Sequence, residues 1–336
     1  MKGILVNTLK YTLFFGLAAW LTFSALKDIK FTDILKTWEE ANKWPIFLSG
    51  IAVMLSHLFR ALRWKLMLNP MGFKFSTWNS YLSILVGYGV NIVVPRGGEL
   101  ARCVNLNKLN GVPVKTSLGT VISERIIDLV FLLTMMGLAF ILEFDKLLST
   151  IVDFLAKGEG AEKGTDPSKL MLIGAIFFIV SIIIIFVLKS SHRIVLRFRV
   201  KIKGFALGLF DGLKSIFNLE HNVLFLFYSF LIWFLYYLMA YFVVLAFAET
   251  GDLGFVGALM ILVLGSIAMA MPMPGGAGAY HHFVPFGLEK LYKIAIPIGT
   301  AFATIFHAWQ TLIHLLIGGV SIVISLVLIR NGKNKR

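Results

Sequence analysis

The sequence has few cysteines and few charged residues. Cys103 is the one cysteine among 336 residues, which excludes an internal disulfide framework and a metal cluster built on cysteine. Charged residues make up 15% of the chain, whereas soluble globular proteins carry about 25%. The polar stretches are too short to fold as a second globular domain. We therefore do not expect a soluble enzyme or a multidomain protein.

Hydrophobic residues are abundant instead. They account for 58% of the chain, and several apolar runs exceed the ~18 residues that indicate a membrane-spanning helix. The run TLFFGLAAWLTFSAL is followed by KDIKFTDILK rather than by a small-residue cleavage site, so we interpret it as an anchor. The composition predicts an all-α polytopic membrane protein.

The apolar runs and the charges between them predict a topology. Full transmembrane spans are expected at 8–26, 45–63, 113–142, 170–188, 222–248 and 294–329, and re-entrant hairpins at 76–94 and 255–271. With both termini in the cytoplasm, the inner side carries 22 Lys/Arg and 5 Asp/Glu, and the outer side 10 and 13. This distribution follows the positive-inside rule. If 76–94 were a full span, the basic loop KSSHRIVLRFRVKIK would lie outside, so we reject that alternative.

The six spans and two hairpins predict a single integral membrane domain, 1–336, made of two similar halves. Residues 1–142 and 170–336 each contain two spans, a hairpin and a long span, in opposite orientations, and 143–169 form an outer loop. Inverted repeats with broken helices near the bilayer midplane are common in transporters. The pattern therefore favours a transporter architecture.

Each predicted hairpin is interrupted by prolines and glycines. The first break lies in VVPRGGELAR and the second in PMPGGAGAYHHF. Irregular backbone at membrane depth is tolerated only inside protein or along a water-filled cavity. Helix N-termini at such breaks present N–H groups suited to an anion. We expect a substrate site between the two tips, the alternative being that each break is a simple turn.

Charged residues gather at the first break and in the span that follows it. They are Arg96, Glu99, Arg102, Glu124, Arg125 and Asp128. Ionisable residues inside a membrane bundle are costly and are functional candidates by default. Arginine also fits phosphate oxygens in a bidentate manner. We expect Arg96 and Arg102 to contact an anion, whereas Glu124 and Arg125 could instead belong to a neutral scaffold that locks the hairpin to the span.

Four histidines of the second half lie at or after the second break. His281 and His282 follow the second break, and His307 and His314 lie seven residues apart on the last span. Histidine titrates near physiological pH and can relay a proton or bond a phosphate. For His307 and His314 the alternative is a polar side chain satisfied within the bundle. The spacing matches no zinc signature, and no metal or other cofactor is predicted.

Five further polar residues receive minor roles. His57, Arg60 and Arg63 are assigned to a membrane boundary because the predicted span ends at residue 63. Tyr88 and Asn91 precede the first break and are candidates to line the same cavity. The predicted substrate-binding residues are Arg96, Gly97, Gly98, Glu99, Arg102, Glu124, Arg125, Asp128, Pro274, Gly275, Gly276, Gly278, His281 and His282.

The stretches PRGGELAR, SERIIDLV and PMPGGAGAYHH, in this order, resemble the three signatures of the flippase-like membrane family, also called the lysylphosphatidylglycerol synthase transmembrane region. The resemblance covers essentially the whole chain. It implies a multi-pass protein of a bacterial or archaeal cytoplasmic (inner) membrane that moves a lipid across the bilayer. The family usually has a glutamate after PGGxG where this chain has His281, so the resemblance by itself implies neither a particular lipid nor proton coupling. Aminoacyl transfer in the family resides in a separate soluble domain, and this chain ends at RNGKNKR, so we expect no synthesis of lysyl lipid.

Together these features predict a lipid translocator rather than an enzyme. The headgroup of an anionic phospholipid or a polyprenyl-phosphate lipid would enter a polar crevice between the hairpins while its tails stay in the bilayer. One alternative is a membrane-embedded enzyme acting on a lipid phosphate, with Glu99, Glu124, Asp128 or His281 as acid or base. Another is a non-transporting assembly factor for envelope enzymes. No nucleic-acid partner is expected, because the net charge of +14 concentrates on the predicted inner side.

Overall fold

The computed structural model describes residue 16 and residues 19–27, 30–156, 219–271 and 273–333, and these residues form helices without a strand. They divide into two compact units, Met1–Ala139 with Leu219–Arg336, and Phe140–Asn218. The shorter elements are α2 (Phe31–Glu40), η1 (Asn69–Met71), α7 (Phe144–Ala156), α11 (Ala248–Gly251) and η2 (Pro274–Gly276). The multi-pass helical class that the composition predicts is confirmed.

Among the described residues, four helices are long and apolar enough to cross a membrane. They are α3 (Lys43–Leu68), α6 (Val114–Leu142), α10 (Asn222–Val244) and α14 (Ile296–Lys333). Each coincides closely with a span expected from the sequence. The other two expected spans, 8–26 and 170–188, lie mostly or wholly outside the described residues. At 1.5 Å per residue the 38-residue α14 would measure ~57 Å, which exceeds the ~30 Å hydrocarbon core.

The first hairpin consists of α4 (Thr77–Val93) and α5 (Gly98–Asn110). The two helices lie antiparallel, because Asn105 Nδ2 donates to Ser83 Oγ at 3.0 Å near their middle and Gly98 N donates to an α4 side chain near the tip. The break predicted from the proline and glycines is therefore present. The tip of the hairpin joins α4 to α5, and the two helices pack against each other.

Glycine is required where α4 and α5 meet. A Cβ on Gly98 would overlap the carbonyl oxygen of Gly87, so the two backbones touch there. Arg96 in the tip has φ 59°, a left-handed conformation that is uncommon for a residue with a side chain. The tip is thus tightly turned and closely packed, which fixes the start of α5 against α4.

The second hairpin consists of α12 (Gly254–Ala270), the short η2 and α13 (Ala279–Tyr292). Gly275, Gly276 and Gly278 have φ of 56°, 74° and 82°, values that glycine adopts without steric cost. These three residues explain why the sequence PGGAG stands at this turn. Two helices again fold back on each other at the position predicted from the sequence.

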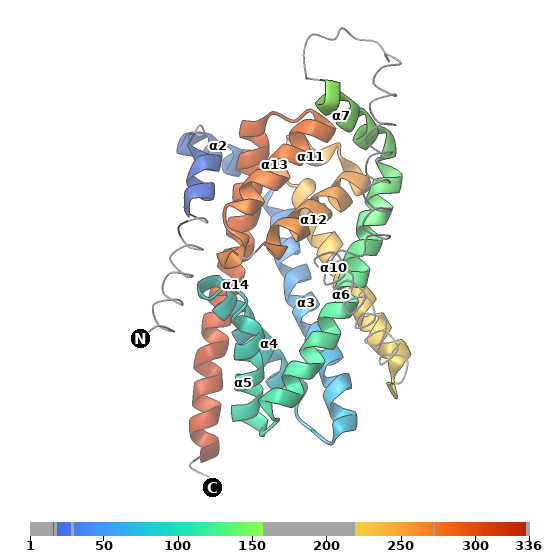
Figure 1. Cartoon of the computed structure of the whole chain (residues 1–336). Helices are drawn as coiled ribbons and strands as arrows, with labels where there is room; N and C mark the ends of the chain where they lie inside the picture. The colour runs from blue at the N-terminus through green and yellow to red at the C-terminus, as the bar shows by residue number, and fades with distance from the viewer. Residues whose placement is uncertain (1–15, 17–18, 28–29, 157–218, 272, 334–336) are drawn as a thin grey trace, which may run out of the picture. The chain divides into compact units, whose positions relative to one another are not determined.

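The larger unit contains two similar sets of helices (Figure 1). In chain order, α3, α4, α5 and α6 form one set, and α10, α12, α13 and α14 form the other. The sets run in opposite directions, since the start of α3 meets the end of α10 through Asn42 N and Ala246 O at 2.8 Å. The hairpin tips approach each other, and Arg96 Nη2 donates to Ala270 O at 2.9 Å.

Helix α14 packs along both hairpins of this unit. It crosses α4 at a pair of glycines, where a Cβ on Gly318 would lie 2.5 Å from Gly89 Cα. Small residues at such crossings let two backbones approach closely. This contact holds the last helix against the hairpin that carries the charged residues.

The smaller unit, Phe140–Asn218, is described for its first 17 residues. Helix α7 begins there with Phe144, and Lys146 Nζ lies 3.0 Å from the carboxylate of Glu143. Residues 157–169 of the predicted outer loop and the basic segment 189–203, which is predicted to lie on the inner side, are outside the described residues.

Candidate functional site

Seven charged side chains form one cluster inside the larger unit. The members are Arg60, Arg63, Glu99, Arg102, Glu124, Arg125 and Asp128. They come from α3, α5 and α6, so three helices meet at the cluster. Most of these side chains are buried, although burial of charge is costly unless each group is paired.

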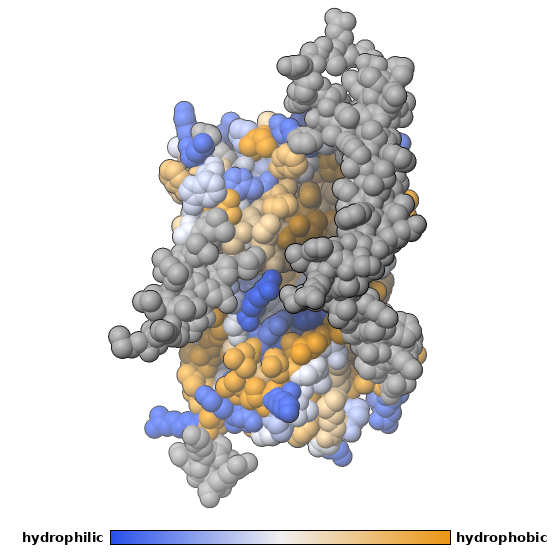
Figure 2. Space-filling model, in the orientation of Figure 1, coloured by the Kyte–Doolittle hydropathy of each residue, from blue (hydrophilic) through white to orange (hydrophobic). Residues whose placement is uncertain are grey.

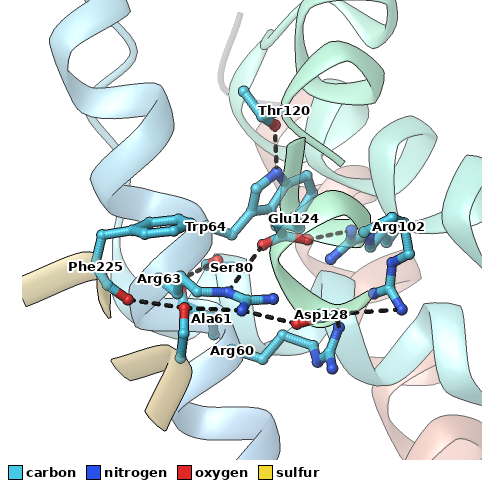
Figure 3. A network of polar contacts seen from close by, with 12 residues as sticks. Arg60, Ala61, Arg63, Trp64, Ser80, Arg102, Thr120, Glu124, Asp128 and Phe225 are labelled. Atoms are coloured by element: carbon cyan, nitrogen blue, oxygen red, sulfur yellow. Dashed lines mark hydrogen bonds and ion pairs between the residues drawn. The ribbon is translucent and has the colours of Figure 1, made fainter. Parts of the chain in front are cut away.

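Asp128 is the centre of the cluster (Figure 3). Its Oδ1 accepts from Arg63 Nη1 at 2.9 Å and its Oδ2 from Arg60 Nη1 at 3.2 Å. Arg125, one turn earlier on the same helix, reaches Oδ2 at 3.4 Å. One carboxylate therefore forms ion pairs with three guanidinium groups, two of which link α6 to α3.

Glu124 forms the second connection, from α6 to the first hairpin. Its Oε2 lies 2.5 Å from Arg102 Nη2, and its Oε1 lies 3.9 Å from Arg63 Nε. The Arg102 guanidinium stacks 4.7 Å from the ring centre of Trp64, whose Nε1 donates to Thr120 Oγ1 at 2.9 Å. Arg102 is therefore fixed in position by both a charge and an aromatic face.

The structure buries three residues that were assigned to a membrane boundary from the sequence. Helix α3 continues to Leu68, five residues beyond the expected end, and buries His57, Arg60 and Arg63 with exposed fractions of 2%, 3% and 0%. Arg60 and Arg63 stand three residues apart, so both point to the same side of α3. The sequence analysis missed this burial, although an i,i+3 arginine pair next to a long apolar run is a signal that could have indicated it.

Glu99 and Arg125 form the outer edge of the cluster. Arg125 Nε lies 3.1 Å from Glu99 Oε1, and their side chains are 45% and 39% exposed. This pair therefore borders the surrounding medium, whereas Glu124 is completely buried. The sequence left open whether Glu124 and Arg125 serve as scaffold or as contact residues, and the burial of Glu124 is what a scaffold residue requires.

A cavity of about 80 Å³ lies beside the cluster. Its lining residues are Arg60, Ile84, Gly87, Tyr88, Asn91, Gly98, Glu99, Arg102 and Arg125. Within the described part of the chain, the buried Nε atoms of Arg60 and Arg102 have no hydrogen-bond partner. Such unpaired buried donors are rare and are satisfied by water or a ligand in most proteins. The sequence-based candidates Tyr88 and Asn91 do line this cavity.

Arg96 does not join the cluster. It is exposed and bonds Ala270 O on the second hairpin, so its side chain connects the two tips. The first N–H of α5 is also occupied, because Gly98 N donates to Asn91 Oδ1 at 2.8 Å. Gly97, the residue before α5, packs against the side chain of Val94.

The contacts described for the predicted residues of the second break do not involve the arginines of the cluster. Gly278 N donates to His281 Nδ1 at 3.3 Å, so this histidine caps its own helix. His307 Nε2 lies 2.8 Å from Gly275 O, and the His281 and His307 rings lie 5.0 Å apart. His282 Nε2 bonds Leu21 O at 2.9 Å. Gly276 packs on the Met269 side chain and Pro274 begins η2, so the break is held by its own contacts.

A second polar contact joins the two sets of helices. His57 Nε2 and His314 Nε2 are 3.0 Å apart, and the ring of Tyr88 lies against both. Tyr236 OH accepts from Arg60 Nη2 at 2.8 Å and lies 3.4 Å from Tyr88 OH. Hydrogen bonds therefore lead from the charged cluster to Tyr88. Among the described residues, no group of three histidine, cysteine or acidic side chains is placed to hold a metal ion.

The molecular surface carries a polar patch on one face. Figure 2 shows hydrophilic side chains gathered at mid-height of one face, with hydrophobic side chains above and below them. A polar patch between two apolar regions is unusual on a helix bundle that faces lipid, where charged groups mark pathways or binding sites.

Comparison with known proteins gives a family. The model of the lysylphosphatidylglycerol synthase TM region matches residues 8–318. A UPF0104 membrane protein of Methanocaldococcus jannaschii is 30% identical over 98 residues, a segment that covers 28% of this chain and 29% of the archaeal protein. No solved structure matches the chain. Because the family model covers nearly the whole sequence, the chain belongs to the family of the lysylphosphatidylglycerol synthase TM region.

Proposed function

We propose that this protein moves an anionic, phosphate-bearing lipid across the membrane. The observation that carries the proposal is the cavity with three arginines in its wall, set beside the tip of a helical hairpin among helices that are long and mainly apolar. Arginine forks bind phosphate oxygens, and a broken helix at membrane depth is a common feature of transporter binding sites.

The proposal includes an arrangement in the bilayer. Both hairpins are re-entrant, six helices span the membrane, and both termini face the cytoplasm. The headgroup occupies the cavity from the side of Glu99 and Arg125, which are half-exposed. The lipid tails stay in the bilayer, and the two oppositely oriented halves alternate access. The location is the inner membrane of a prokaryote, as expected from the family signatures.

We propose transport rather than chemistry because of how the carboxylates are used. Glu99, Glu124 and Asp128 each lie in an ion pair with an arginine. A general base needs a carboxylate that can reach the proton it removes, and these three are engaged in pairs. The family's name refers to a synthase, but the charged cluster described here favours binding of a phosphate.

The proposal is tested in proteoliposomes that contain the purified chain and fluorescent phosphatidylglycerol. Dithionite, which bleaches only the outer leaflet, reports movement between leaflets. We expect protein-dependent movement that slows at least fivefold in Arg125→Gln. Lys36→Gln is the matched control, because Lys36 forms an exposed pair with Glu40 away from the cluster.

Two outcomes would count against the proposal. Mass spectrometry that shows a chemically altered lipid would favour an enzyme. No protein-dependent movement across a panel of anionic phospholipids and polyprenyl phosphates would favour an assembly factor.

A further inference from the structure

A groove lies between α3 and α4, on the face of α3 that points away from the charged cluster. It measures about 260 Å³, and its lining residues are Met54, Leu55, Leu58, Thr77, Trp78 and Tyr81. Arg63, a member of the cluster, follows Met54 by nine residues. Nine residues are about two and a half helical turns at ~3.6 residues per turn, so the two side chains lie on opposite faces of α3. The groove is therefore separate from the charged cluster.

The two walls of the groove are joined by hydrogen bonds. Ser80 Oγ of α4 donates to Ala61 O of α3 at 2.9 Å, and Tyr81 OH donates to Met54 O at 3.4 Å. Two lining residues, Leu55 and Trp78, are 40% and 52% exposed, so the groove opens at the surface of the helix pair. Because α3 is long and apolar enough to cross a membrane, the medium that this surface meets is lipid.

The length of the groove face corresponds to one leaflet of a bilayer. Lys65 follows Met54 by eleven residues, which is close to three helical turns, so both lie on the same face of α3. At ~1.5 Å per residue they are ~16 Å apart along the helix. Half of the ~30 Å hydrocarbon core is ~15 Å. An acyl chain that runs along α3 from Lys65 to Met54 would therefore span its own leaflet.

Lys65 supplies a positive charge at one end of this face. Its Nζ donates to Thr77 Oγ1 at 3.3 Å, and Thr77 lines the groove. Within the described part of the chain, no ion pair involves Lys65. Lysines near a membrane surface attract anionic lipids. Trp78, the next residue after Thr77, is of a type that prefers the level of the lipid headgroups. This end of the groove therefore suits an anionic headgroup.

The volume of the groove limits how much of a lipid it holds. Pockets that enclose a whole small molecule measure ~300–1,000 Å³, and this groove is smaller. Its apolar lining excludes the charged headgroup, because burial of charge among apolar side chains is costly. A single acyl chain fits these limits, with the headgroup outside the groove.

We propose that the groove between α3 and α4 binds one acyl chain of an anionic membrane lipid, whose phosphate lies at the Lys65 ammonium. The proposal goes beyond the proposed transport, because it requires only that α3 crosses a membrane. It gives the protein a second lipid site, on the face of α3 opposite the charged cluster.

The test uses the tryptophan fluorescence of the full chain in phosphatidylcholine nanodiscs. Bromine atoms on an acyl chain quench a tryptophan that the chain contacts. The chain contains seven tryptophans, so the signal of Trp78 is taken as the difference between the unaltered chain and Trp78→Phe. We expect a small fraction of brominated phosphatidylglycerol to quench Trp78 at least threefold more than the same fraction of brominated phosphatidylcholine.

Two substitutions of Lys65 test the charge. Lys65→Gln should abolish the preference for phosphatidylglycerol, whereas Lys65→Arg keeps the charge and should retain it. Lys36→Gln is the control, because Lys36 forms an exposed pair with Glu40 on α2, and it should leave the preference unchanged.

One substitution tests the shape. Leu58→Phe narrows the groove and should reduce the quenching of Trp78 by either brominated lipid at least twofold. Leu133→Phe on α6 is the matched control, because Leu133 is 54% exposed and does not line the groove.

Four results would overturn the proposal. The first is equal quenching of Trp78 by the two brominated lipids, and the second is a preference that survives in Lys65→Gln. The third is no quenching of Trp78 by either lipid, which would indicate that protein, such as a second copy of the chain, covers the groove. The fourth is loss of the preference on adding water-soluble glycerophosphoglycerol, which would identify a free phosphodiester rather than a lipid as the ligand.

Discussion

Replacing Asp128 by asparagine removes the carboxylate that joins three arginines while keeping the size of the side chain. The Asp128 oxygens lie 2.9, 3.2 and 3.4 Å from Arg63, Arg60 and Arg125. A unit charge pair at 4 Å is worth about 4 kcal/mol at an effective dielectric of 20, so three pairs would together exceed 10 kcal/mol before desolvation is subtracted. Breaking a buried pair from one side costs ~3–5 kcal/mol in measured cases. We expect a loss near the upper end, against a total stability of ~5–15 kcal/mol typical of folded proteins.

The assay is equilibrium unfolding in mixed micelles, followed by tryptophan fluorescence. Glu99→Gln is the matched control, because it also removes one carboxylate from the cluster but from a half-exposed pair, and such pairs contribute less than about 1 kcal/mol. A double variant, Asp128→Asn with Arg125→Gln, should recover part of the loss, since it restores the original net charge. Equal free energies of unfolding for Asp128→Asn and Glu99→Gln would refute the argument that burial gives Asp128 its role.

Two other predictions concern packing in the larger unit and use the same unfolding assay. Gly318→Ala should lower the free energy of unfolding by ~1–3 kcal/mol, because the new Cβ would lie 2.5 Å from Gly89 Cα. Gly319 has open space around it, so Gly319→Ala should be neutral or should stabilise α14 by up to about 1 kcal/mol. Equal effects of the two substitutions would contradict the proposed crossing. Trp64→Phe should cost at least ~1 kcal/mol, because it removes the hydrogen bond to Thr120, and a change within 0.5 kcal/mol would contradict this.

The structure changes how the charged motifs are understood. The sequence suggested a balance of three arginines and three carboxylates, with Arg96 among them. In the folded chain Arg96 bonds the other hairpin, and Arg60 and Arg63 enter the cluster from α3. Among the described residues, the count becomes four arginines against three carboxylates.

His281 makes a contact that was not predicted from the sequence. Its Nδ1 accepts the N–H of Gly278, so it occupies the start of α13 as a capping group. The sequence suggested that the N-terminus of this helix would be open to an anion. Gly98 in the first hairpin is likewise bonded by Asn91. Side chains rather than free helix ends therefore supply the donors that line the cavity.

The sequence by itself determined the helical membrane class and the position of both hairpins. Apolar runs and proline–glycine clusters act locally, over a few residues, so the ends of α4 and α12 lie within about one residue of the expected bounds. It also indicated Glu99, Arg102, Glu124, Arg125 and Asp128, because charges within a motif near apolar runs stand out. The sequence did not predict which residues form ion pairs with them.

Only the tertiary structure decided which charges pair. Asp128 binds Arg60 and Arg63, which precede it by more than 60 residues, and this pairing depends on how α6 and α3 lie in the folded chain. Helix-crossing angles follow from side-chain packing along whole helices, not from any local motif. The cavity, and the meeting of three arginines in its wall, arise from that long-range packing.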